Sequence, residues 1–129
     1  SDYAHHPNEI YHSARSIRQL YQNRKITAIF QPHLYTRTRD FYKEFADALS
    51  QLDEVILCDI YPAREEPIPG VTSKLIYDNL KEGEEKSLIS KDEVIGLVKE
   101  RDFDVLIVLG AGDLDNQVPQ IANIIEAKQ

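Results

Sequence analysis

A chain of 129 residues is long enough to fold as one domain around a single core, without a disulfide or a metal ion to hold it. Its 22 acidic and 15 basic residues give a net charge of −7, which argues against nucleic acid and anionic lipid as partners. No apolar run approaches the roughly 20 residues that span a bilayer, and the polar N-terminus has no signal-peptide core. The single cysteine has no partner for an internal disulfide. We therefore expect a soluble, cytoplasmic protein.

The hydrophobic pattern alternates between helical and strand-like segments. In chain order it predicts a helix after Pro7, a strand at 26–30, a helix at 41–52, a strand at 54–60, a helix at 71–80, a short strand at 87–89, a helix at 94–98, a strand at 103–109 and a helix at 118–125. The three main strands are almost continuously apolar, which is typical of strands covered on both faces. We therefore predict an α/β fold with a Rossmann-like, doubly wound, mostly parallel sheet and helices on both faces.

Two connecting segments have a clear character. Residues 61–70 contain three prolines and a glycine, which indicates a stiff surface loop. The Glu-rich segment 81–86 is expected to be a solvated turn. Cys58 lies inside an apolar run, so its thiol is expected to be buried and inert.

The residues that follow each strand are the most informative for function, because ligands of open α/β sheets bind beyond the carboxyl ends of the strands. Gln31-Pro32-His33 follows the first strand, with Arg37 close behind, the 61–70 loop follows the second, and Gly110-Ala111-Gly112 follows the third main strand. We expect all three to project at one edge of the sheet.

His33 and Arg37 are the leading candidates for ligand binding. A cation in the first turn of a helix opposes the positive end of the helix dipole, so Arg37 and Arg39 lie where helix stability alone would not place them. Arg37 is suited to gripping a carboxylate, and His33 to orienting or deprotonating an amine. The alternative is a surface histidine beside a helix-capping Thr36, with an ion pair between Arg37 and Asp40.

Other possible motifs are weaker. Gly110 and Gly112 precede a helix, but no third glycine follows at the spacing of a phosphate-binding turn, so we favour a purely structural role for them. The N-terminal histidines His5 and His6 do not form a convincing zinc site, and we expect no metal; His6 and His12 are expected to be solvated on a helix surface. The chain contains no P-loop and no nucleophile elbow.

Four motifs together resemble the Mur ligase family. They are D-Y-A-H-H-P-N-E-I at 2–10, F-Q-P-H-L-Y-T-R-T-R-D at 30–40, D-I-Y-P-A-R-E-E-P-I-P-G-V-T-S at 59–73 and L-G-A-G-D at 109–113. The second and third are quite specific within the family, and the four together most resemble the members that join L-alanine to UDP-N-acetylmuramate. The resemblance covers essentially the whole chain.

The resemblance implies that residues 1–129 form the C-terminal, amino-acid-binding domain of a three-domain ligase of peptidoglycan biosynthesis, and hence of cell shape and division. The UDP-sugar domain and the P-loop ATPase domain would lie outside this chain. ATP would activate UDP-N-acetylmuramate as an acyl phosphate that L-alanine attacks, with ATP and Mg²⁺ bound mainly by the ATPase domain. The fragment alone would contain no catalytic residue and would be inactive.

Site residues are carried over from the resemblance position by position. Tyr3, His5, His33 and Arg37 would bind L-alanine, and Asp2 would contact the ribose of ATP. Many relatives have arginine where this chain has Leu34, so one positive contact is missing, and Arg39 is a candidate to replace it.

Two alternatives remain open from the sequence. One is the corresponding domain of murein peptide ligase, which uses a tripeptide in place of alanine, although the 30–40 motif argues against it. The other is a non-catalytic regulatory module that binds a small anion. An upstream P-loop in the same reading frame would favour a ligase over the module.

Overall fold

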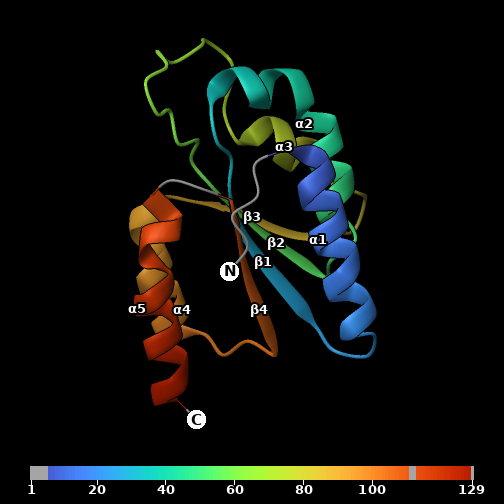
Figure 1. The fold of residues 1–129 in the computed structure, drawn as a ribbon, viewed down its shortest axis with the longest axis vertical. Helices are drawn as coiled ribbons and strands as arrows, with labels where there is room; N and C mark the ends of the chain where they lie inside the picture. The colour runs from blue at the N-terminus through green and yellow to red at the C-terminus, as the bar shows by residue number, and fades with distance from the viewer. Residues whose placement is uncertain (1–5, 111–112, 129) are drawn as a thin grey trace.

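The computed structural model describes residues 6–110 and 113–128, and the side chains of 6–110 and 117–128. Within these residues four parallel strands form one sheet in the order β3-β2-β1-β4 (Figure 1). The strands are β1 (Ile26–Gln31), β2 (Glu54–Cys58), β3 (Glu85–Ile89) and β4 (Val105–Gly110). The helices are α1 (Pro7–Leu20), α2 (Tyr35–Leu49), α3 (Lys74–Asn79), α4 (Val94–Glu100) and α5 (Asp113–Ala127), with a 3₁₀ turn η1 (Lys91–Glu93) before α4.

The sheet is covered on both faces, as its continuously apolar strands predict. Helices α1, α2 and α3 pack on one face, and α4 and α5 lie on the other (Figure 1). Strand β1 shows the alternation: Phe30 belongs to the α1–α3 side, where its ring packs 5.4 Å from that of Phe45, whereas Ile29 belongs to the buried cluster on the other side, together with Val98. The predicted doubly wound, parallel α/β fold is confirmed.

Helix α1 begins with a capping box whose N-cap residue is a histidine, which is not one of the residue types from which a cap is usually predicted. His6 is the N-cap residue: its Nδ1 accepts a hydrogen bond from the amide of Asn8 at 3.2 Å, and its own amide donates to Glu9 Oε1 at 3.1 Å. Pro7 occupies the first helical position, where its missing N–H costs nothing. His6 is exposed, as expected, and its imidazole in addition takes the N-cap role that serine or threonine usually fills.

Several element boundaries differ from the sequence prediction, and three of the differences concern α2, α3 and β3. Helix α2 begins at Tyr35, earlier than its apolar stripe, and is kinked at Phe41, where φ is −129° and ψ is 16°. Helix α3 is only six residues long. Strand β3 begins at Glu85, which lies inside the segment 81–86 that was predicted to be a turn. No helix of the described residues has both the length and the hydropathy needed to cross a membrane.

Cys58 fulfils the expectation of a buried thiol. It ends β2 with none of its surface exposed, and burial raises the pKa of the thiol to about 12. Since the thiolate is the reactive form, this cysteine is inert near neutral pH.

Glu84 contradicts the prediction of a fully solvated 81–86 turn. Its side chain is 1% exposed, and within the described part of the chain neither carboxylate oxygen has a hydrogen-bond partner. Lys81 Nζ lies 3.5 Å from Oε1, an ion-pair distance that is too long for a good hydrogen bond. The other buried carboxylate, Glu54, instead accepts from Arg101 Nη2 at 2.8 Å. Burial therefore raises the pKa of Glu84 from its ordinary 4.5 to about 7.

This buried acid should make the protein less stable as the pH rises from about 4.5 to 7. Over that range the folded state keeps the proton on Glu84 while the unfolded state releases it, so the folded state loses up to about 3 kcal/mol relative to the unfolded state. Glu84→Gln should remove this part of the pH dependence, as measured by urea unfolding at pH 5 and pH 8. Glu82→Gln, at an exposed position of the same turn, is the matched control. An unchanged pH dependence in Glu84→Gln would contradict the assignment.

Candidate functional site

The segments that follow β1 and β2 meet beyond the sheet. This agrees with the rule that residues after the carboxyl ends of parallel strands gather at one edge, which we call the strand-end rule. His33 and Tyr61 form an isolated parallel bridge that prolongs the pairing of the two strands. The amide of Tyr61 donates to the carbonyl of Pro32 at 2.8 Å, and the amide of Leu34 donates to the carbonyl of Tyr61, also at 2.8 Å. The 61–70 loop rises from this end of the sheet, on the side where α2 begins (Figure 1). The chain therefore brings two of its distinctive motifs side by side.

His33 and Arg37 lie together at this edge. Arg37 Nη1 is 3.1 Å from His33 Nδ1, and the imidazole stacks on the ring of Tyr61 with centroids 5.5 Å apart and planes 25° apart. All three side chains are half-buried, so they are neither enclosed in the core nor fully solvated. We call His33, Arg37 and Tyr61 the strand-end cluster.

The contact between Arg37 and His33 fixes the state of the imidazole. A guanidinium has donors and no acceptor, so Nδ1 of His33 must accept the hydrogen bond, and in the neutral ring the proton lies on Nε2. A second proton on Nδ1 would break the bond and set two cations against each other. His33 therefore holds the Arg37 side chain in place only when its ring is neutral.

The purely structural interpretation of this segment fails in its details. Asp40 is paired with Arg39, whose Nε donates to it at 2.9 Å, and not with Arg37. Thr36 does not cap α2 with its own side chain, because its hydroxyl donates to Glu65 in the 61–70 loop. Arg37 is thus left directed toward His33.

Leu34 and Arg39 are the two positions at which the resemblance predicted a missing positive contact and its replacement. Leu34 is the N-cap residue of α2, with φ at +76°, and is half-buried. Arg39 is exposed and holds Asp40, although it is near enough to Glu65 to contribute to lowering the pKa of that carboxyl. The exposure of Arg39 and its ion pair with Asp40 favour a surface role over the predicted replacement of the missing contact, which stays untested.

Three of the predicted site residues, Asp2, Tyr3 and His5, lie outside the described residues, and their roles also stay predictions. The described residues include no group of three or more His, Cys, Asp or Glu side chains placed to hold a metal ion.

Gly110 ends β4 opposite Gln31 of β1 and has a structural reason to be glycine. Its φ is +113°, and a Cβ there would collide with the carbonyl oxygen of Gln31. The structural interpretation of this glycine is supported, whereas Gly112 is not among the described residues. By lacking a side chain, Gly110 allows the ends of β1 and β4 to approach closely beside the strand-end cluster.

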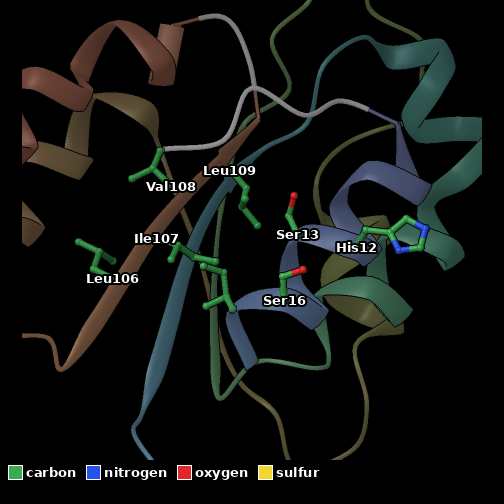
Figure 2. Close-up of a pocket in the computed structure, with 8 residues that line it drawn as sticks. His12, Ser13, Ser16, Leu106, Ile107, Val108 and Leu109 are labelled. Atoms are coloured by element: carbon green, nitrogen blue, oxygen red, sulfur yellow. The ribbon is translucent and has the colours of Figure 1, made fainter. Parts of the chain in front are cut away.

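A separate pocket of about 480 Å³ lies between α1 and β4 (Figure 2). Figure 2 shows Ser13 and Ser16 of α1 on the same side of β4 as the side chains of Ile107 and Leu109, while the ring of His12 turns away from the strand. The side chains of Leu106 and Val108 point to the opposite side of β4. Of the predicted site residues that the structure describes, neither His33 nor Arg37 lines this pocket. Among the described residues, its lining contains no Asp, Glu, Lys or Arg side chain that could pair with an amino acid or a phosphate.

The structure adds two residues that sequence reasoning did not select. Tyr61 supplies the ring on which His33 stacks, and Glu65 accepts hydrogen bonds from Thr36 at the start of α2. Both lie in the loop after β2, which the strand-end rule placed at the correct edge. To select these two from the ten residues of the loop, one must know the three-dimensional path of the loop, which no local sequence pattern predicts.

Comparison with known proteins agrees with this arrangement. A sequence model described as "Mur ligase, glutamate ligase domain" matches residues 1–112. The chain belongs to this family. The expected resemblance is thereby confirmed, and the strand-end cluster is part of a Mur ligase domain.

Individual relatives of this Mur ligase domain carry a more specific name. A protein of Phocaeicola vulgatus named UDP-N-acetylmuramate--L-alanine ligase is 66% identical over 128 residues, which is 99% of this chain and 28% of that protein. The structure of the UDP-N-acetylmuramate-alanine ligase MurC of Thermotoga maritima matches with a TM-score of 0.75 and 27% identity, over 100% of this chain and 26% of that one. A murein peptide ligase of Psychrobacter arcticus shares the fold, with a TM-score of 0.72 and 16% identity over 97% of this chain and 26% of that one. The chain thus spans about a quarter of the length of these relatives.

Proposed function

We propose that this chain is the C-terminal, amino-acid-binding domain of an ATP-dependent ligase that joins L-alanine to UDP-N-acetylmuramate in peptidoglycan biosynthesis. The observation that carries the proposal is the 66% identity, across 99% of the chain, to a relative named for that reaction. The geometry of the strand-end cluster is consistent with it, because a guanidinium at the rim of the sheet suits the carboxylate of an amino acid.

Arg37 would bind the carboxylate of L-alanine and so hold the amine toward the activated carboxyl of the sugar substrate. The nitrogen lone pair would then attack the carbonyl carbon of the acyl phosphate, phosphate would leave with the electron pair of the broken C–O bond, and the amine would lose a proton. This chain would contribute position and charge to the reaction. Because Nδ1 of His33 accepts from Arg37, His33 is set up to orient Arg37 and not to take that proton.

The remaining components would come from other parts of the ligase. Tyr3 and His5 would wall the alanine pocket and Asp2 would meet the ribose of ATP. We assign no ligand of Mg²⁺ to this chain, because its described residues offer no cluster of metal-binding side chains. The P-loop and UDP-sugar domains would complete the site, and a cytoplasmic location would give access to both nucleotide substrates.

Neither alternative is favoured. The murein peptide ligase shares only the fold, at 16% identity, whereas relatives named UDP-N-acetylmuramate--L-alanine ligase reach 66% identity. No observation points specifically to a free-standing regulatory module.

The test is to supply the complete protein with ATP, UDP-N-acetylmuramate and one amino substrate at a time: L-alanine, glycine or the tripeptide of the murein peptide ligase reaction. We expect phosphate release to be fastest with L-alanine. Preference for the tripeptide would favour the first alternative, and no release with any of the three would favour the second.

A further inference from the structure

The start of helix α2 lacks any cap from its own residues. Its N-cap residue, Leu34, makes no side-chain hydrogen bond, and no acidic residue occupies the first turn. Helices usually have Ser, Thr, Asp or Asn at the N-cap and acids in the first turn, because free amides and the positive end of the dipole are there. Here the first turn carries Arg37 instead.

Glu65 of the 61–70 loop supplies the missing group. One of its carboxylate oxygens accepts from the amide of Thr36 at 3.1 Å, and the other accepts from the hydroxyl of Thr36. The hydroxyl of Thr36 and the amides of Thr36 and Tyr35 lower the pKa of Glu65 below its ordinary value, so the group is an anion near neutral pH. The loop after β2 thus places a negative charge where α2 needs one.

The kink at Phe41 makes this contact important for Arg37. Because the helical geometry is interrupted there, residues 35–40 form a short first segment that the long remainder of α2 does not hold in line. Thr36, which Glu65 binds, directly precedes Arg37 in this segment. On the other side, Leu34 is hydrogen-bonded to Tyr61 of the same loop. The backbone that carries Arg37 is therefore fixed by the 61–70 loop.

We propose that Glu65 is a positioning residue for L-alanine: by binding Thr36 it orients the first segment of α2, so that the guanidinium of Arg37 meets His33 and the carboxylate of the substrate. This role rests on the proposed function. Glu65 touches neither substrate nor reacting atoms, and its effect passes through Arg37.

The test uses three variants of the complete protein. Glu65→Ala removes both hydrogen bonds and should raise the KM for L-alanine about tenfold while leaving the KM for ATP within about twofold. Glu65→Gln keeps an acceptor for the Thr36 amide and an amide that the Thr36 hydroxyl can accept from, so it should restore most of the affinity for L-alanine. Glu66→Ala, at the exposed neighbouring position, is the matched control and should resemble the wild type.

The outcomes separate the two proposals. If the wild-type protein releases phosphate with L-alanine but Glu65→Ala matches Glu66→Ala, the proposed function stands and the role of Glu65 is overturned. If Glu65→Ala raises the KM values for L-alanine and ATP equally, Glu65 has a general structural role and does not position the amino acid. If the wild-type protein shows no response to L-alanine, the proposed function fails, and the role of Glu65 falls with it.

Discussion

Arg37→Ala in the complete protein is expected to raise the KM for L-alanine about 100-fold, because a charged hydrogen bond between a guanidinium and a carboxylate contributes about 2–3 kcal/mol. The KM for ATP should stay within about twofold of the wild-type value, since the strand-end cluster is assigned to the amino acid alone. Both constants are measured from initial rates of phosphate release while one substrate is varied at a time.

Arg39→Ala is the matched control for this variant. Arg39 lies two residues further along the same first segment of α2, but it is exposed and held by Asp40. Its loss removes the same charge from the same helix and should change the KM for L-alanine by no more than about threefold, the scale of a surface ion pair. If Arg37→Ala and Arg39→Ala raise the KM for L-alanine equally, the carboxylate is bound by the general positive charge of the helix and not by Arg37.

Gly110→Ala should destabilise the domain by about 4 kcal/mol, because the new Cβ would combine a disfavoured positive φ with a collision against the backbone of β1. The carbonyl oxygen of Gln31 has little freedom to move away, since Gln31 is buried and its side-chain amide donates to the carbonyl of Asp59. Urea unfolding of the chain measures the loss.

Gly96→Ala is the control for a glycine without such constraints. Gly96 is exposed on α4, and a Cβ there would meet nothing within 4 Å. This substitution should stabilise the chain by about 0.5–1 kcal/mol, because alanine has the better helix propensity. A Gly110→Ala variant as stable as Gly96→Ala would show that the ends of β1 and β4 are not packed as closely as the structure indicates.

The strands and their layering were predictable from the sequence because the signal is local. Continuous apolar runs such as Ile26–Phe30 can only be covered on both faces, and the parallel, doubly wound sheet follows from the helices between them. The segment 81–86 was mispredicted because its composition is that of a solvated turn. Only the pairing of β3 with β2 and the packing over Glu84 bury part of it.

The candidate site was predictable in part for a similar reason. The strand-end rule places the residues after β1 and β2 at one edge without knowledge of side-chain contacts, and the dipole argument singles out Arg37. The same argument left open how α2 could begin with a cation in its first turn. The answer is Glu65, about 30 residues away in sequence, and a contact of that range depends on the path of the 61–70 loop.

The central claim is that Arg37, held by His33 at the rim of the sheet, receives the carboxylate of the amino acid. Its most direct test is a crystal structure of the complete protein with L-alanine and a non-hydrolysable ATP analogue. The account predicts a carboxylate oxygen of L-alanine about 2.8 Å from a nitrogen of the Arg37 guanidinium, the usual distance for such a charged pair. L-alanine bound at a place where Arg37 does not reach its carboxylate would contradict the account.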